Sequence, residues 1–255
     1  MRNIKLTIEY DGGRYDGWQR LGKDESSNTI EKKLLEVICK MTNEVVTLNC
    51  GARTEVGVHA YEQTANFLTK SDMRPLEMKH YFNRYLPRDI AVTFVDEVPE
   101  RFHASLNAKS VTYLYRIAIG DTIPVFDRKY VYYCFGKLNL EKMQEASELL
   151  LGEHDFKAFS SVKKSKKSTV RTIESIDIYS DGNEVQITIK ANDFLHNMAR
   201  IIVGVLLEVG EEVQEPNIVS EIFNNGVRNE EIEMADAKGL FLQEVEYDEL
   251  VLQRR

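Results

Sequence analysis

Two successive series of short strands and amphipathic helices constrain the fold of this chain more than any other feature of its sequence. Alternating apolar and polar residues predict strands, and apolar residues three or four positions apart predict helices. The first series has expected strands at 5–10, 45–49, 58–67 and 90–95, with helices at 28–40 and 74–86. The second has expected strands at 110–119, 173–179, 184–190 and 240–247, with helices at 139–151, 194–209 and 218–224.

This order of elements predicts a mixed α+β protein made of two similar halves. We expect the halves at residues 1–105 and 106–255, each with an antiparallel sheet and helices packed on it. A chain of 255 residues is long enough for one large domain or two modest ones. The halves share the order of their elements and no evident sequence repeat.

Composition indicates an ordinary globular protein rather than a membrane or secreted one. Hydrophobic residues make up 43% of the chain, but the longest apolar run, 201–207, is far shorter than the roughly 20 residues of a membrane span. Residues 1–10 alternate between charged and apolar, unlike a signal peptide. We therefore expect a cytoplasmic protein.

The cysteines Cys39, Cys50 and Cys134 are odd in number and widely spaced, and they include no C-x-x-C pair. This pattern predicts neither a disulfide framework nor a zinc site. The histidines are scattered as well, so we expect no metal.

Charge is distributed unevenly along the chain. A net charge of −8 argues mildly against binding of nucleic acid, because such binding depends on neutralising phosphates. The basic run at 163–171 is either a solvated loop, as charge runs usually are, or a phosphate contact. The candidate phosphate-binding residues are Lys163, Lys164, Lys166, Lys167 and Arg171, extended by Arg14 and Arg20.

The densest group of chemically capable residues lies in the glycine-bounded segment 51–57. Arg53 and Glu55 flank Thr54 in an expected loop. Such a loop can hold a carboxylate at a cleft, beside a cation that keeps it ionised. The same residues can form a surface ion pair in a turn, and local chemistry alone favours this simpler interpretation.

Eight short segments, in a fixed order, extend over nearly the whole chain. They are Y-D-G at 10–12 with G-W-Q-R at 17–20, R-T-E-V-G-V-H at 53–59, L-P-R-D-I at 86–90, F-H-A at 102–104, Y-L-Y at 113–115, G-E-H-D-F at 152–156, F-L-H-N-M-A-R at 194–200 and K-G-L at 238–240. Together they resemble motifs of the TruA family of tRNA pseudouridine synthases. Any one segment is weak evidence, whereas eight in order are hard to produce by chance.

The resemblance implies a fold of two ferredoxin-like (RRM-like) halves with a cleft between them, in agreement with the repeated series of elements. It implies conversion of uridine to pseudouridine in the anticodon stem-loop of tRNA, with the target base out of its stack. The family reaction uses no metal, nucleotide or redox cofactor. The family protein is a homodimer that binds one tRNA across both subunits.

The same resemblance gives five positions a role in the reaction. Glu55 is the carboxylate, acting as nucleophile at C1′ or as base at C2′, with Arg53 beside it. Tyr113 stacks on the uracil or assists removal of the C5 proton. Arg200 pairs with the carboxylate from the other half, and Leu240 lines the pocket. Without the resemblance, Tyr113 is equally well interpreted as an inward core residue, Leu240 is a core residue by default, and Arg200 can be an ordinary surface charge.

The sequence departs from the family motif at Glu55 and Val56, where the family carries aspartate and alanine. Glutamate keeps the charge, but its extra methylene moves the carboxylate by about 1 Å, which can cost about a hundredfold in rate. The alternative function is therefore a catalytically impaired family member that binds or helps fold tRNA. A third class, a small-molecule α+β enzyme, is disfavoured because the sequence contains neither G-x-G-x-x-G nor a P-loop.

Overall fold

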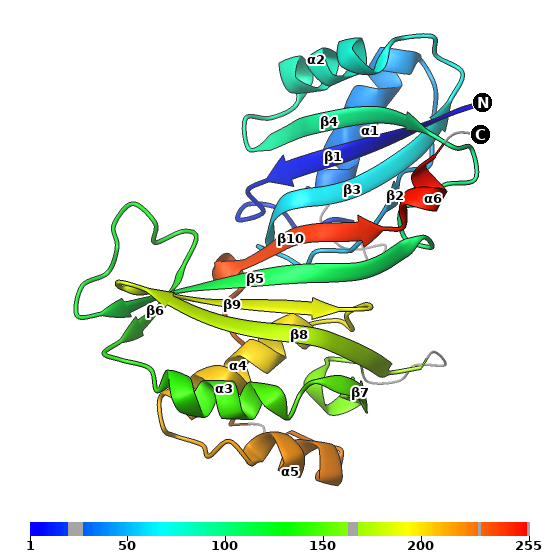
Figure 1. Cartoon of the computed structure of the whole chain (residues 1–255). Helices are drawn as coiled ribbons and strands as arrows, with labels where there is room; N and C mark the ends of the chain where they lie inside the picture. The colour runs from blue at the N-terminus through cyan, green and yellow to red at the C-terminus, as the bar shows by residue number, and fades with distance from the viewer. Residues whose placement is uncertain (20–27, 163–167, 229–230, 254–255) are drawn as a thin grey trace. The chain divides into compact units, whose positions relative to one another are not determined.

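The computed structural model of the chain describes residues 1–19, 28–162, 168–228 and 231–253 (Figure 1). In these four ranges, no helix is both long enough and apolar enough to cross a membrane.

The chain divides into two compact units. Unit 1 consists of Met1–Val111 and Phe241–Arg255, and unit 2 of Thr112–Leu240. The predicted division at residue 105 differs from these units mainly at the C-terminal segment. That segment follows unit 2 in the sequence but belongs to unit 1.

Unit 1 contains a mixed β-sheet. Its strands are β1 (Arg2–Tyr10), β2 (Asn49–Cys50), β3 (His59–Thr69), β4 (Ile90–Val98) and β10 (Leu240–Tyr247). They follow the order β4-β1-β3-β10, with β2 beside β3. β1 is antiparallel to β3 and β4, but β10 is parallel to β3, with Phe241 opposite His59. The prediction of purely antiparallel sheets is therefore wrong, because strand direction depends on the path of the chain and not on local periodicity.

The helices of unit 1 are α1 (Ile30–Thr42) and α2 (Pro75–Tyr85), followed after β10 by the short α6 (Glu249–Leu252). α1 begins where Thr29 caps it, since the Thr29 hydroxyl accepts a hydrogen bond from the Lys32 N–H at 3.3 Å. Figure 1 shows α1 lying across one face of β1, β3 and β4. The core of this unit combines the apolar stripe of α1 with alternate residues of β1, namely Ile30, Leu34, Val37 and Ile38 with Ile4, Leu6 and Ile8.

Unit 2 contains a second mixed set of strands. They are β5 (Ala108–Gly120), which starts in unit 1, β6 (Tyr132–Phe135), β7 (Gly152–Asp155), β8 (Val170–Asp181) and β9 (Glu184–Ala191). Their order is β5-β9-β8-β7, and β6 pairs with β5 in parallel. β8 and β9 form the predicted hairpin, whose turn has Gly182 at a φ of 58°, where glycine is favoured. The helices of this unit are α3 (Leu140–Glu148), α4 (Met198–Gly210) and α5 (Ile218–Asn225).

The predicted elements differ from the structure most clearly at two places. The expected strand at 45–49 is reduced to the two residues of β2, and Val45 is 98% exposed. Leu48 is the only buried side chain of that stretch, which is too little apolar contact to hold a strand against the sheet. The helix expected from residue 194 begins at Met198, because Asn197 precedes it with a left-handed φ of 63°.

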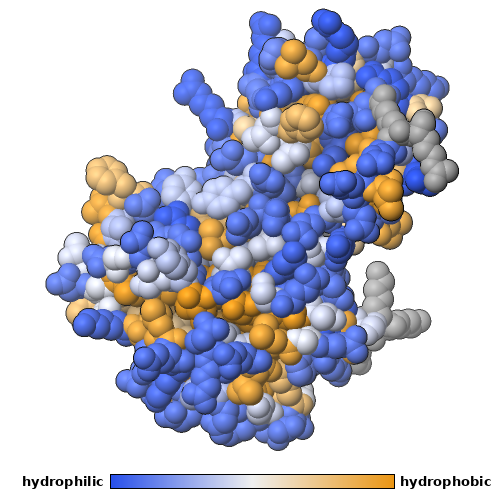
Figure 2. Space-filling model, in the orientation of Figure 1, coloured by the Kyte–Doolittle hydropathy of each residue, from blue (hydrophilic) through white to orange (hydrophobic). Residues whose placement is uncertain are grey.

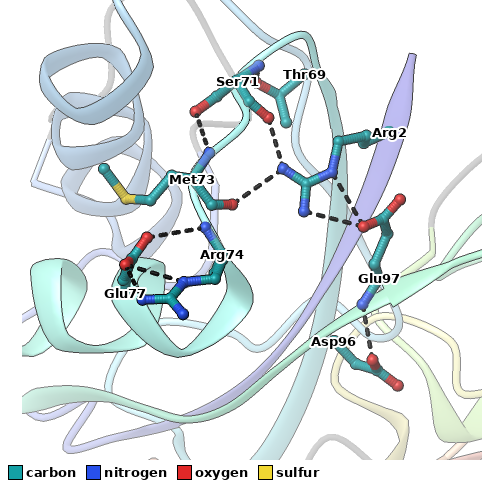
Figure 3. A network of polar contacts seen from close by, with 8 residues as sticks. All are labelled: Arg2, Thr69, Ser71, Met73, Arg74, Glu77, Asp96 and Glu97. Atoms are coloured by element: carbon teal, nitrogen blue, oxygen red, sulfur yellow. Dashed lines mark hydrogen bonds and ion pairs between the residues drawn. The ribbon is translucent and has the colours of Figure 1, made fainter.

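Arg2 ties the sheet of unit 1 to the segment between β3 and α2 (Figure 3). Its Nη1 donates to the carbonyls of Ser71 and Met73, at 2.5 and 2.9 Å. Its Nε and Nη2 lie 3.0 and 2.9 Å from Glu97 Oε2 on β4. The ion pair is mostly buried, so removal of one partner leaves the other charge desolvated.

Replacing Arg2 with methionine is expected to lower the free energy of unfolding by about 1–3 kcal/mol, because Glu97 and two carbonyls lose their donor. Urea denaturation measures this change. Lys109→Met is the matched control, since Lys109 pairs with Asp248 at 3.6 Å and both side chains are more than 60% exposed. Exposed pairs contribute about 0–1 kcal/mol, so an equal loss in the two variants would contradict the role given to Arg2.

Candidate active site

The segment that carries Arg53 and Glu55 forms a turn between β2 and β3 of unit 1. The Val58 N–H donates to the Glu55 carbonyl at 3.2 Å, which closes the turn. Thr54 is buried, whereas Arg53 is exposed and Glu55 is half-buried. The turn therefore leaves Arg53 and Glu55, the two residues predicted to act in the reaction, at least partly accessible to solvent.

Two glycines of the segment 10–18 allow its backbone to touch this turn. A Cβ atom on Gly12 would lie 1.9 Å from the Val58 carbonyl oxygen. Gly17 has a φ of 80°, and a Cβ atom there would lie 2.8 Å from the Thr54 carbonyl oxygen. No side chain fits at these distances, so both positions require glycine. Close packing against the turn thus explains the glycines of the first family-like segment.

Trp18 connects the turn to the start of α1 by hydrogen bonds. The Trp18 N–H donates to the Thr54 carbonyl at 3.0 Å, and the Glu31 N–H donates to the Trp18 carbonyl at 2.9 Å. The Trp18 side chain is fully buried. One residue therefore fixes the turn relative to the first turn of the helix.

Arg53 acts electrostatically on Glu31 of α1. Burial raises the pKa of the Glu31 carboxyl, and the positive charge of Arg53 opposes that rise. Burial also raises the pKa of the neighbouring Cys50 thiol to about 12, again opposed by Arg53, so this thiol stays protonated and unreactive at neutral pH. Glu31 belongs to the surroundings of Arg53, although nothing in the sequence pattern predicts it.

His59, at the start of β3, is a buried residue that joins the turn to β10. Its Nδ1 accepts a hydrogen bond from the Gly12 N–H at 3.1 Å and lies 3.1 Å from Asp11 Oδ1. Its ring stacks on Phe241 with a centroid separation of 4.8 Å, and Phe241 stacks on Tyr61 at the same separation. These contacts explain the histidine by packing within unit 1.

The predicted uracil-stacking residue of unit 2, Tyr113, is buried in β5, and its side chain is only 6% exposed. Its ring meets Phe194 edge-on, with centroids 4.9 Å apart and an interplanar angle of 87°. Leu240 is also buried. The Tyr113–Phe194 contact brings together two of the family-like segments.

A segment before β10 holds Arg200 in place on α4. The Arg200 Nε donates to the Ala235 carbonyl at 2.8 Å, and the Ala235 N–H donates to the Arg200 carbonyl at 3.1 Å. A Cβ atom on Gly204, one turn along the helix, would lie 2.1 Å from the Glu233 carbonyl oxygen. Glycine at this position thus permits the close approach, and Arg200 is a half-buried, positioned cation rather than an ordinary surface charge.

Two of the candidate phosphate-binding residues form ion pairs within their own units. Arg14 pairs with Asp89, and its side chain is 64% exposed. Arg171 pairs with Asp193 at 3.0 Å and donates to two backbone carbonyls, and its side chain is 18% exposed. Arg14 therefore remains open to solvent, whereas Arg171 is mainly engaged within unit 2. The other candidates lie outside the described residues, namely Arg20, Lys163, Lys164, Lys166 and Lys167.

The chain resembles known proteins over nearly its whole length. A family model described as tRNA pseudouridine synthase matches residues 6–106 and 146–248. A tRNA pseudouridine synthase A 2 of Bacillus cereus is 44% identical over 247 residues, which cover 97% of this chain and 100% of that protein. The same coverage holds for a tRNA pseudouridine synthase A of a Bacillus species, at 44% identity, and for a tRNA pseudouridine synthase A 2 of Clostridium perfringens, at 42%.

Among solved structures, a Cbf5-Nop10-Gar1 complex matches with a TM-score of 0.36 and 12% sequence identity. The match covers 80% of this chain and 45% of the chain in that structure. This structural similarity is too low to support an argument.

Gly17→Ala is expected to lower the free energy of unfolding by about 3–4 kcal/mol, because the new Cβ atom meets backbone atoms and adopts a strained φ. Gly226→Ala is the control, since Gly226 has a φ of 66° but its Cβ atom would have no neighbour within 4 Å. That variant carries only the backbone strain of about 1–2 kcal/mol. Urea denaturation compares the two, and similar losses would show that the turn does not press against Gly17.

Proposed function

The chain belongs to the TruA family of tRNA pseudouridine synthases, and we propose that it converts uridine to pseudouridine in the anticodon stem-loop of tRNA. The observation that carries this proposal is similarity over the whole chain. Relatives that are 44% identical align with 97% of it, and the family model matches segments in both units. Two ferredoxin-like halves with a cleft between them are part of the same proposal.

The reaction is an isomerisation, so its atoms and electrons balance without a co-substrate. The bond between N1 and C1′ breaks, the uracil turns, and a bond forms between C5 and C1′. The proton on C5 leaves, and N1 gains a proton. The chain must supply a carboxylate near the sugar and a group that takes the C5 proton, once the base has left its stack.

We assign the carboxylate to Glu55. The backbone of its turn is held by the contact with Gly17 and by the hydrogen bond from Trp18 to Thr54. Side-chain length therefore decides where the carboxylate lies. Arg53, on the same turn, supplies positive charge beside it.

The proposal gives three residues of unit 2 a role in the same reaction. Tyr113 stacks on the uracil or assists removal of the C5 proton, and Leu240 lines the pocket. Arg200 pairs with the carboxylate of Glu55. The hydrogen bond between Arg200 Nε and the Ala235 carbonyl supports this role, because it fixes the direction of the guanidinium group.

We propose that tRNA binds through phosphate contacts, although the protein is acidic overall. Arg14 supports this proposal because its side chain is 64% exposed, although it pairs with Asp89. The contribution of Arg171 is indirect, since its guanidinium is engaged by Asp193. The proposed lysine contacts are Lys163, Lys164, Lys166 and Lys167, with Arg20 as a further cation.

A cytoplasmic homodimer, in which one tRNA contacts both subunits, completes the proposal. It rests on the family resemblance. The loop between β5 and β6 exposes the apolar residues Ile123, Val125 and Phe126, and Figure 2 shows apolar surface at the tip of this loop. Exposed apolar groups of this kind are typical of surfaces that another molecule covers.

Glu55→Gln is expected to reduce pseudouridine formation by about 10²–10⁴-fold, because the variant loses the only carboxylate of the turn at nearly constant size. Its affinity for tRNA should be unchanged, since the carboxylate acts in the chemical step. Glu55→Asp should be at least as active as the wild type, and up to about a hundredfold faster if carboxylate position limits the rate. Single-turnover conversion of a tRNA transcript, followed by nucleoside analysis, measures all three proteins.

Full activity in Glu55→Gln would remove Glu55 from the catalytic role. A wild-type protein that binds tRNA but converts no uridine would instead favour the impaired family member as the function.

Charge reversal at Lys163, Lys164, Lys166 and Lys167 is expected to weaken tRNA binding by a similar factor for different tRNA sequences, because phosphates carry no base identity. The affinity of the wild type should fall steeply with salt, and the variant should show a shallower dependence. Filter binding at several salt concentrations measures both slopes. Identical slopes would exclude the lysine run as a phosphate contact.

A further inference from the structure

Gln63 is a fully buried amide on the core-facing side of β3 in unit 1. It lies opposite Ile8 of β1, and the next residues on the same side of the strand, Ala65 and Phe67, are buried and apolar. An apolar residue at this position would avoid the free-energy cost of burying an amide, which is about 1–3 kcal/mol if the amide is unpaired. The glutamine therefore requires a specific reason.

Both polar atoms of the Gln63 side chain bind one residue, Ala52. Its Oε1 accepts a hydrogen bond from the Ala52 N–H at 3.3 Å, and its Nε2 donates to the Ala52 carbonyl at 2.5 Å. The side chain pairs with Ala52 as a neighbouring strand would. Ala52 directly precedes Arg53, at a point where the chain has left β2 and has no strand partner of its own.

Tyr10 holds the residue on the other side of Arg53. Its hydroxyl lies 2.7 Å from Thr54 Oγ1, and Gln63 Nε2 donates to the same hydroxyl at 3.5 Å. Burial raises the pKa of Tyr10, so the phenol keeps its proton and can donate to Thr54. All three side chains are nearly or fully buried.

Gln63 and Tyr10 thus clamp Ala52 and Thr54, the two neighbours of Arg53. A buried polar network whose members are paired is rigid, because an alternative arrangement would leave polar groups unpaired. Catalysis is sensitive to such rigidity, since a displacement of about 1 Å can reduce the rate about a hundredfold.

We propose that Gln63 is a positioning residue for the reaction, which holds the Ala52 backbone directly and the Thr54 hydroxyl through Tyr10, and thereby fixes the direction of Arg53 and Glu55. The inference rests on the proposed function of this turn. It extends that function to a side chain that touches neither substrate nor the reacting atoms.

The first test compares Gln63→Leu with a matched control, Asn83→Leu. Asn83 of α2 makes the same pair of bonds to one residue elsewhere in unit 1, since its Nδ2 donates to the Val92 carbonyl at 2.8 Å and its Oδ1 accepts from the Val92 N–H at 2.9 Å. Both variants lose the pair of hydrogen bonds to one backbone residue, and Gln63→Leu also loses the 3.5 Å bond to the Tyr10 hydroxyl. Gln63→Leu is expected to lower kcat about 10- to 100-fold with KM for tRNA unchanged, whereas Asn83→Leu keeps the wild-type kcat.

The second test uses Gln63→Glu, a substitution that keeps the size of the side chain and so leaves no cavity. An ionised carboxylate can accept from the Ala52 N–H but cannot donate to the Ala52 carbonyl. A protonated carboxyl restores both bonds, and burial raises the pKa of such a group toward neutrality. The ratio of kcat in Gln63→Glu to kcat in the wild type should therefore rise as pH falls from about 8 to about 6.

The outcomes separate the two proposals. An inactive wild type overturns the proposed function, and this inference with it. An active wild type with full kcat in Gln63→Leu overturns only the inference, as does an equal loss of kcat in Asn83→Leu. If Gln63→Leu does not fold, the pH series decides, and a ratio that stays constant with pH overturns the positioning role.

Discussion

Contact between two stretches of backbone, at 10–18 and at 53–58, is the constraint on which the candidate site of unit 1 depends. Gly12 and Gly17 leave no space for a side chain between them and the turn. The same contact places Trp18, which in turn bonds the start of α1. Close-packed interiors transmit strain rather than absorb it, so the spacing of these backbones sets the direction in which Glu55 leaves the turn.

Much of the fold follows from local pattern, because the signals for β1, the β8–β9 hairpin and the start of α1 are contained in neighbouring residues. The pattern fails where distant parts of the chain decide. β10 lies parallel to β3, which no periodicity encodes. The alternation at 45–49 does not produce a strand, since only Leu48 finds a place in the core.

The sequence predicts the solvent-accessible residues of the candidate site better than the buried residues that support them. Arg53 and Glu55 are visible in the sequence because they lie in a glycine-bounded loop that resembles a family motif, in which Glu55 replaces the aspartate of the family. Gln63 and Glu31 are not, because their significance lies in which groups they face across the fold. The sequence marks Gln63 only as a polar residue at an inward position of an alternating strand. The folded structure shows that both polar atoms of its amide form hydrogen bonds with Ala52.

The division of the chain into units also orders the events of synthesis. Unit 2 is continuous in sequence, whereas unit 1 is interrupted by it and closes with a strand from Phe241 onward. Domains fold as their residues emerge from the ribosome, so unit 2 can reach its final form while unit 1 still lacks β10. Until then His59 has no Phe241 to stack on, and the segment that follows the Glu55 turn is incomplete. A nascent chain therefore completes the packing around His59 only after β10 has been synthesised.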